Sequence, residues 1–269
     1  PRSTLFPYTT LFRSQQQLTS ILAINMSIFY KDIRDLLALQ SIHYESAKYG
    51  PSDYAIYLNK DYGSVKGITF SLTKRHDPVT RLSAWADYTY QVAKGNSVRS
   101  GSFFFNSLTG EEEEKRIAPL SWDQRQIMSA TLMFGDPRKW SVSFIGKLSS
   151  GWPYTPDIPN ANYVPEPNSD NKPWQRNVNM RIQKTFNLQN FRLVAFAKIY
   201  NLFDTRNERY VYDDTGRAGY TYGYQSNQET DELIRHYGEP GIHTWNEYMN
   251  RPYYYTAPRS VSIGLTVDL

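Results

Sequence analysis

The most constraining feature of this sequence is an alternation of apolar and polar side chains that recurs in eight segments after residue 20. In LAINMSIFY (22–30) every second residue is Leu, Ile, Met or Tyr, and the residues between them are mostly small or polar. Similar alternation occurs in KGITFSLTKR, RLSAWADYTY, QIMSATLMF, WSVSFIGKL, NVNMRIQKTF and SVSIGLTVDL, and less cleanly in FRLVAFAKIYNLF. Since successive strand residues point to opposite faces, the pattern predicts eight strands, most with one apolar and one polar face.

The segments between these strands alternate in length. Short links at 76–80, 135–139 and 187–190 carry Asp, Asn, Pro or Gly and are of hairpin size. Long links lie at about 39–54, 96–122, 151–174 and 205–255, and they are rich in Gly, Pro, Asn and Tyr. A link as long as the last one is unusual in a compact soluble domain, but tight turns at one end and long loops at the other are typical of transmembrane β-barrels. The fold class predicted is therefore all-β, an antiparallel transmembrane β-barrel segment with short periplasmic turns and long outer loops.

Aromatic residues make up 15% of the chain, and many of them fall near the ends of the predicted strands. Trp140, Phe191, Phe134 and Phe186 flank the short links. Near the long links lie Tyr88, Tyr90, Trp152, Tyr154, Trp174, Phe203 and the tyrosines at 253–255. Barrels carry an aromatic girdle at each membrane interface, so the distribution favours a barrel over a soluble β-sandwich, in which aromatics would be expected in mid-strand.

Composition excludes several classes of protein and of site. The chain has no cysteine and hence no disulfide or thiolate metal site, and no run of 18 apolar residues that would predict a membrane-spanning helix. The net charge is +4, but the basic residues are scattered, so no nucleic-acid partner is expected. No nucleophile–base arrangement or phosphate-binding loop fits the predicted strands, so neither an enzyme nor a cofactor is expected.

Two groups of residues could suggest a metal site. His236 and His243 share the longest link with Asp231, Glu232 and Glu239, whereas His43 and His76 lie far away in the sequence. The run GEEEEKR (110–116) gathers four carboxylates in one link. Metal ligands need converging spacing and a supporting shell, and a run of like charge is more often a solvated stretch. No metal site is predicted.

Residues 1–14 differ in kind from the rest of the chain. Leu5–Ser14 matches the in-frame translation of a widely used sequencing-library adapter, and the segment has no helix or strand pattern and no signal-peptide pattern. We therefore interpret 1–14 as an artefactual leader outside the fold and 15–269 as the protein. An adapter at this position also suggests that the true N-terminus is missing.

Several stretches resemble the C-terminal part of TonB-dependent outer-membrane receptors. They are DYGSVKGITFSLTKR (61–75), YTYQVAKGNS (88–97), RNVNMRIQKTFNLQNFRLVAFAKIYNLFDTRN (176–207) and APRSVSIGLTVDL (257–269). The NLFD after an alternating strand and the amphipathic strand that ends the sequence are the most telling. One departure is that the family's chains often end in an aromatic residue, whereas this sequence ends in Leu269.

The resemblance implies that about eight strands of a larger barrel are present and that the N-terminal plug domain is absent. It implies an outer-membrane receptor of a double-membraned bacterium that takes up a scarce ligand, such as an iron chelate, cobalamin or a glycan. The implied partners are outer-membrane lipid, the TonB complex through the missing plug, and the barrel assembly machinery through the last strand. The ligand itself is not identified by the sequence.

Three sets of site residues follow from the pattern and the resemblance. Aromatic residues of the longest link are predicted to contact ligand because they offer stiff contact area with polar tips: Tyr210, Tyr212, Tyr220, Tyr222, Tyr224, Tyr237, Trp245 and Tyr248. The polar residues Asn177, Asn179, Arg181 and Gln183 are predicted to face the barrel lumen. The last strand is predicted to face lipid with Val261, Ile263, Leu265, Val267 and Leu269.

Two other functions fit the same strands. One is a complete eight-stranded outer-membrane barrel with an adhesive or structural role. The other is a soluble carbohydrate-binding β-sandwich, which would leave the aromatic residues near strand ends unexplained. The receptor interpretation predicts that the isolated chain aggregates without detergent, because its first and last strands would be open edges, and detergent dependence separates both barrel interpretations from the sandwich.

Overall fold

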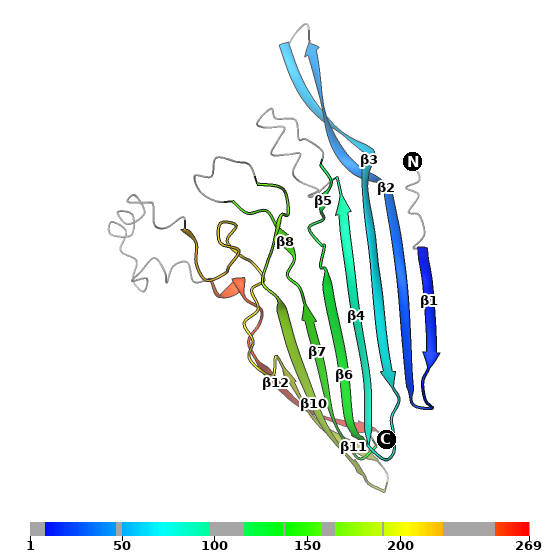
Figure 1. Ribbon diagram of the computed structural model, residues 1–269. Coiled ribbons are helices and arrows are strands. Elements are labelled where there is room, and N and C mark those ends of the chain that lie inside the picture. Colours follow the sequence, from blue (N-terminus) through cyan, green and yellow to red (C-terminus); the bar gives the residue numbers. More distant parts are fainter. Residues whose placement is uncertain are drawn as a thin grey trace, which may run out of the picture.

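The computed structural model of the chain describes residues 9–46, 50–96, 116–136, 138–157, 165–189, 191–222 and 251–268. Nearly all of the regular structure belongs to one antiparallel sheet of ten strands, in the order β1-β2-β3-β4-β6-β7-β10-β11-β12, with the short β5 beside β4 (Figure 1). In the described ranges no helix is long and apolar enough to cross a membrane.

The strands follow one another along the sheet as they do along the chain. They are β1 (Thr9–Gln17), β2 (Leu22–Ser46), β3 (Gly50–Lys74), β4 (Leu82–Gly95), β5 (Ala118–Pro119), β6 (Gln126–Asp136), β7 (Trp140–Ser149), β10 (Gln175–Asn187), β11 (Arg192–Tyr200) and β12 (Ser260–Asp268). The strands β8 (Pro153–Tyr154) and β9 (Asp170–Asn171) form a separate pair, and a single 3-10 turn, η2 (Pro252–Tyr254), precedes β12.

The eight strands predicted from the alternation are confirmed, and each pairs antiparallel with its neighbour. Figure 1 shows a curved sheet with short turns at one end and long connections at the other. The architecture is that of a β-barrel segment. Within the described residues β1 and β12 are the two ends of the sheet and do not pair with each other.

One correction concerns the leader. Residues 1–14 were interpreted as lying outside the fold, but Thr9–Ser14 belongs to β1, which pairs with β2 from Thr9↔Tyr30 to Gln17↔Ala23. The edge of β2 presents backbone groups that need hydrogen-bond partners, and a neighbouring segment can supply them whatever its side chains. The origin of residues 1–14 stays a prediction.

A second correction concerns the link predicted at 39–54. This segment is almost entirely strand, because β2 and β3 pair with each other as far as Ser46↔Gly50. On β3, pairing with β4 ends at Gly63↔Gly95, so β2 and β3 continue beyond the sheet as a two-stranded arm (Figure 1). An irregularity in register between Ile33 and Leu36, with Asp35 at φ 58°, marks where the arm begins.

The pairing register assembles two chemically distinct faces across the whole sheet. The apolar face carries, among others, Ile24, Met26, Phe70, Leu72, Leu132, Phe134, Phe144, Met180, Ile182, Val261, Ile263 and Leu265. The polar face carries Asn25, Ser71, Asp87, Ser129, Ser143, Asn177, Asn179, Arg181, Gln183 and Ser262, which pair in the same registers. The apolar sides of the predicted strands therefore form one continuous apolar face of the sheet, and their polar sides form the opposite face.

The apolar face is exposed. Leu132 in the middle of the sheet is 46% exposed and Ile263 on β12 is 83% exposed, and most large side chains of this face are similar. In a β-sandwich a second sheet would cover these side chains, but the only other sheet in the described ranges is the two-stranded β8–β9 pair. The sandwich prediction is therefore wrong, and the face has the character of a surface made for an apolar environment.

A small core lies on the opposite, polar face. Phe29, Val65, Ala93 and Leu120 form a buried cluster, with Ile33 packed against it. The segment after β5 is held there because Leu120 donates its N–H to the Ala93 carbonyl, and the buried Asp123 carboxylate accepts the Ala93 N–H at 2.7 Å. Part of the connection between β4 and β6 thus folds back over the polar face.

The aromatic residues near the short turns lie where a girdle would place them. Phe134 and Trp140 share the apolar face across the β6–β7 turn, with ring centroids 5.8 Å apart, and Phe186 is exposed at the end of β10. Tyr154 is an exception at the other end of the sheet. It is only 7% exposed, and its hydroxyl donates to Asp170 Oδ2 at 3.2 Å, so it packs within the connections and not at their surface.

Candidate functional site

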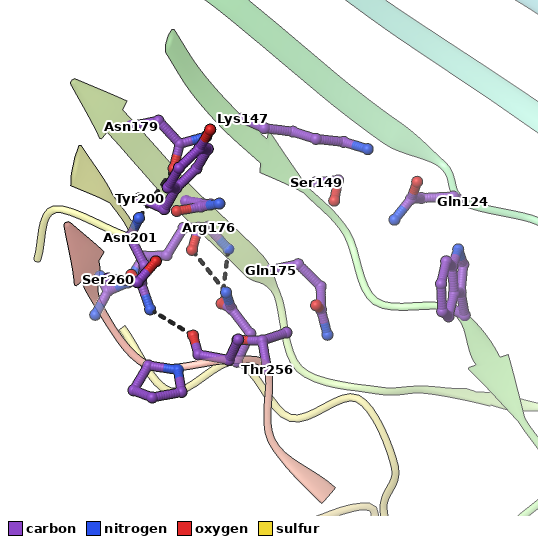
Figure 2. Close-up of a pocket in the computed structure, with 15 residues that line it drawn as sticks. Gln124, Lys147, Ser149, Gln175, Arg176, Asn179, Tyr200, Asn201, Thr256 and Ser260 are labelled. Carbon is purple, nitrogen blue, oxygen red and sulfur yellow. Dashed lines mark hydrogen bonds between the residues drawn. The ribbon is translucent and has the colours of Figure 1, made fainter. Parts of the chain in front are cut away.

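A recess of about 510 Å³ opens on the polar face at the end of the sheet that bears the long connections (Figure 2). Six side-chain amides line it: Gln124, Gln175, Asn177, Asn179, Asn201 and Asn207. Hydroxyls from Ser149, Thr256 and Ser260, the rings of Trp152 and Tyr200, and Lys147 complete most of its wall. None of the described residues that line it is acidic.

The pairing of the strands determines which side chains lie together at the centre of this site. Gln175, Asn177 and Asn179 lie two residues apart on β10 and therefore share the polar face. In the register with β7, Asn177 is opposite Lys147 and Gln175 is opposite Ser149. On the other side, Tyr200 of β11 is opposite Ser260 of β12. Four neighbouring strands thus contribute one wall of polar side chains.

The Asn207 side chain lines the recess and forms hydrogen bonds with the backbone of β10, as a neighbouring strand would. Its Oδ1 accepts the backbone N–H of Arg176 and its Nδ2 donates to the Arg176 carbonyl, both at 2.8 Å. This pair of bonds imitates a backbone partner for β10, and it is drawn as dashed lines in Figure 2. The connection after β11 is thereby fixed against the first residues of β10.

The NLFD motif (201–204) forms a compact turn beside the recess. Asn201 and Asp204 both have left-handed backbone conformations, with φ of 52°. The Asn201 side chain accepts the Thr205 N–H at 2.8 Å and donates to the carbonyls of Thr205 and Ala257. Asp204 Oδ1 accepts the Arg259 N–H at 2.8 Å. The motif therefore joins the end of β11 to the segment that leads into β12.

Two side-chain oxygens in the wall of the recess have no hydrogen-bond partner among the described residues. Asn177 Oδ1 and Thr256 Oγ1 are buried from solvent, and neither atom receives a hydrogen bond. Asn177 belongs to β10, whereas Thr256 lies in the connection that precedes β12. Buried polar atoms without partners are uncommon, so these two oxygens mark where a bound molecule could form hydrogen bonds.

A cluster of aromatic and arginine side chains lies in the connections near the same end of the sheet. Tyr254 of η2 is at its centre, with ring centroids of Tyr210 and Tyr212 at 5.8 and 5.2 Å. The Arg251 guanidinium lies 5.4 Å from the Tyr254 ring and 5.7 Å from the Tyr212 ring. Such contacts fix a cation between two aromatic faces.

An ion pair between the buried Glu208 carboxylate and the exposed Arg217 side chain holds the connection that carries these tyrosines. The Arg217 guanidinium donates to both oxygens of Glu208, with its shortest contact 2.7 Å, and Glu208 Oε2 also accepts the Ala218 N–H at 2.6 Å. The hydrogen bond to Glu208 raises the pKa of Arg217 above its usual value. The Glu208 carbonyl accepts from Gln175 Nε2 at 2.7 Å, so this connection is also bonded to the recess wall.

Some of the predicted site residues lie in the aromatic cluster or in the recess, and others lie elsewhere or outside the described residues. Tyr210 and Tyr212 meet in the aromatic cluster, whereas Tyr220 and Tyr222 are exposed and contact each other. Asn177 and Asn179 line the recess, and Arg181 and Gln183 lie further along the same face. Tyr224, Tyr237, Trp245, Tyr248 and Leu269 lie outside the described residues.

Val261, Ile263, Leu265 and Val267 lie on the apolar face of β12, where the predicted alternation puts them. Which face contacts lipid and which faces the lumen stays a prediction. Trp152, Asn207, Arg251 and Thr256 were not predicted as site residues. Their places are set by hydrogen bonds and ring contacts between distant connections, for which the sequence carries no periodic signal.

The described ranges contain no group of three or more His, Asp or Glu residues that could hold a metal ion. His236, His243 and the acidic residues at 111–114 lie outside those ranges.

The fold resembles the crystal structure of the outer membrane transporter YddB from Escherichia coli. The likeness has a TM-score of 0.53 at 14% sequence identity, and it covers 73% of this chain and 28% of that transporter. No family model and no curated protein matches the chain. The likeness shows that the sheet has the fold of part of an outer-membrane β-barrel.

Proposed function

We propose that this chain is part of an outer-membrane receptor that binds a small ligand and takes part in its uptake. The observation that carries the proposal is a ligand-sized polar recess on one face of a sheet whose other face is apolar and exposed. A barrel wall needs these two properties together, because its outer face meets lipid and its inner face meets water and solute.

The likeness to an outer membrane transporter supports a role in transport. The finer proposal is uptake driven through TonB, with an iron chelate, cobalamin or a glycan as ligand. It rests on the receptor-like stretches, including the NLFD turn, and on the long connections around the recess. In this proposal the partners are outer-membrane lipid, the TonB complex and the barrel assembly machinery.

A small closed barrel with an adhesive role has less support. Its first and last strands would have to pair, and β1 and β12 do not pair within the part of the chain that the structure describes. The exposed edges instead favour a wall to which further strands are added.

A deletion of the gene in its source bacterium tests the proposal. Uptake of radiolabelled ferric chelates, cobalamin and oligosaccharides would be measured with and without a protonophore. We expect one of these uptake activities to be lost in the deletion strain and to be abolished by the protonophore in the parent. Restoration by the intact gene is the control. Unchanged uptake of all three ligand classes would contradict the proposal.

A further inference from the structure

Three cations on the polar face of β7, β10 and β11 have no carboxylate opposite them in the strand register. Arg181 on β10 lies directly opposite Lys198 on β11, and Lys147 lies on the same face of β7. Like charges directly opposite each other destabilise a sheet pair. In the described residues none of the three has an ion pair, and the polar-face positions of these strands and of β6 hold no acidic residue.

The two opposed cations are held in place by an aromatic ring. The Arg181 guanidinium lies 5.0 Å and the Lys198 Nζ 5.2 Å from the centroid of Phe196. This arrangement keeps both charges on the wall below the recess. Together with Lys147 they form a positive strip that leads from the recess along the polar face.

The recess itself has the chemistry of a sugar site. Asn177 Oδ1 needs a hydrogen-bond donor and the Thr256 hydroxyl can donate or accept, and sugar hydroxyls can do both. Trp152 and Tyr200 are 47% and 45% exposed, so their ring faces are accessible for packing against the apolar face of a pyranose. Asn179 Oδ1 already accepts the Asn201 N–H, which fixes that amide and leaves its NH2 group as a donor.

We propose that the recess binds an acidic oligosaccharide, with a uronate carboxylate at Lys147 and sugar hydroxyls at Asn177 Oδ1 and Thr256 Oγ1. The positive strip formed by Arg181 and Lys198 attracts further carboxylates of the same chain. This inference rests on the proposed function and names the class of its ligand.

Calorimetry on the full chain in detergent, with trigalacturonate and its neutral methyl ester as probes, tests the inference. The two probes share every hydroxyl; the ester differs in lacking the carboxylate charges and in carrying a small methyl group on each carboxyl. A charge-assisted hydrogen bond contributes about 1.5 kcal/mol or more, so we expect the acid to bind at least about tenfold more tightly than the ester. The difference should shrink as salt is added.

Three substitutions, one of them a control, test whether the charge of the ligand decides its affinity. Lys147→Gln should weaken binding of the acid about tenfold and leave the ester unchanged. Lys184→Gln is the matched control, because Lys184 lies on β10 but on the opposite face, and it should change neither affinity. Asn177→Asp keeps the size of the side chain and adds a negative charge beside Lys147, so it should weaken the acid more than the ester. Circular dichroism would verify that each variant is folded.

Equal affinity for the two probes, no binding of either, or an acid affinity unchanged by Lys147→Gln would overturn the inference. These results would leave the proposed function intact if the deletion strain still loses uptake of another ligand. Conversely, tight binding of the acid with unchanged uptake in the deletion strain would contradict the transport role and retain the sugar site.

Discussion

At the scale of single residues, much of the order around the recess comes from side chains that satisfy backbone groups. Asn201, Asp204 and Asn207 each bond to the backbone of a distant segment. Two of them adopt left-handed conformations, which Asn and Asp tolerate better than most residues. The NLFD sequence could therefore be recognised as a family feature, but its structural role required the positions of residues 257 and 259.

Substitutions at Asn201 can separate the contribution of its side-chain hydrogen bonds from that of its left-handed backbone conformation. Asn201→Gly keeps the left-handed conformation and removes the bonds to Thr205 and Ala257, so we expect a loss of about 2–3 kcal/mol in the free energy of unfolding. Asn201→Ala should cost about 1 kcal/mol more, because alanine is strained at that φ. Urea unfolding in detergent, followed by tryptophan fluorescence, measures both variants.

The control for this series is Asn187→Ala, at an exposed position at the end of β10, where a change of less than about 0.5 kcal/mol is expected. If Asn201→Ala were no more destabilising than Asn187→Ala, the turn would not anchor the connections.

Tyr154 should make stability depend on pH in the alkaline range. Burial, and then the Asp170 carboxylate, raises the pKa of Tyr154 to about 12 from a usual value of 10.0. The unfolded chain therefore loses this proton first, and the contribution of Tyr154 is complete below pH 10 and falls as pH rises toward 12. Unfolding midpoints at pH 9 and 11.5 should differ less for Tyr154→Phe than for the parent.

Tyr222→Phe is the matched control, because this tyrosine is exposed, and it should retain the pH dependence of the parent. At neutral pH, Tyr154→Phe should cost about 1 kcal/mol through loss of its bond to Asp170. The same pH response in Tyr154→Phe and the parent would show that other groups cause it.

At the scale of elements, the alternation of apolar and polar residues predicted the strands that the structure pairs into one sheet. All eight alternating segments are strands, since alternation is a local signal that the sheet preserves. The arm formed by β2 and β3 was missed because Gly50, Pro51 and Asp53 indicate a loop, whereas pairing with residues 43–46 makes the segment extended. The strand β1 was missed because TTLFRSQQQ alternates poorly and was set aside for its origin.

Close strand contacts explain why a small residue occupies one position in the middle of β3. A Cβ at Gly67 would lie 2.5 Å from Phe29 Cζ and 2.6 Å from the backbone oxygen of Tyr90. The ring of Phe29 could move, but the Tyr90 carbonyl belongs to the paired strand β4. Gly67→Ala should therefore lower the free energy of unfolding by about 1–3 kcal/mol.

Gly146 provides the comparison, because a Cβ there would meet its nearest neighbour at 3.9 Å. Gly146→Ala should change stability by less than about 0.5 kcal/mol in the same denaturation experiment. Equal effects at the two glycines would argue against the packing of Phe29 over Gly67.

At the scale of the whole molecule, the central feature is a sheet with one exposed apolar face and one polar face that carries a recess. The sidedness could be predicted from the sequence, and so could Asn177 and Asn179 as polar-face residues. The recess could not, because Asn207 and Thr256 reach it through connections whose paths are set by long-range hydrogen bonds. The exposed face also explains why the chain is expected to aggregate without detergent.

Site-specific fluorescence quenching in lipid vesicles shows which face of the sheet meets lipid. The sequence contains no cysteine, so single cysteines can carry an environment-sensitive dye at Leu132 on the apolar face and at Thr131, its neighbour on the polar face. We expect a lipid-borne quencher to act on the dye at 132 and aqueous iodide on the dye at 131, with the same alternation for Ile263→Cys and Ser262→Cys. Iodide quenching at all four positions, or the reverse alternation, would show that the apolar face does not meet lipid and that the sheet is not a barrel wall.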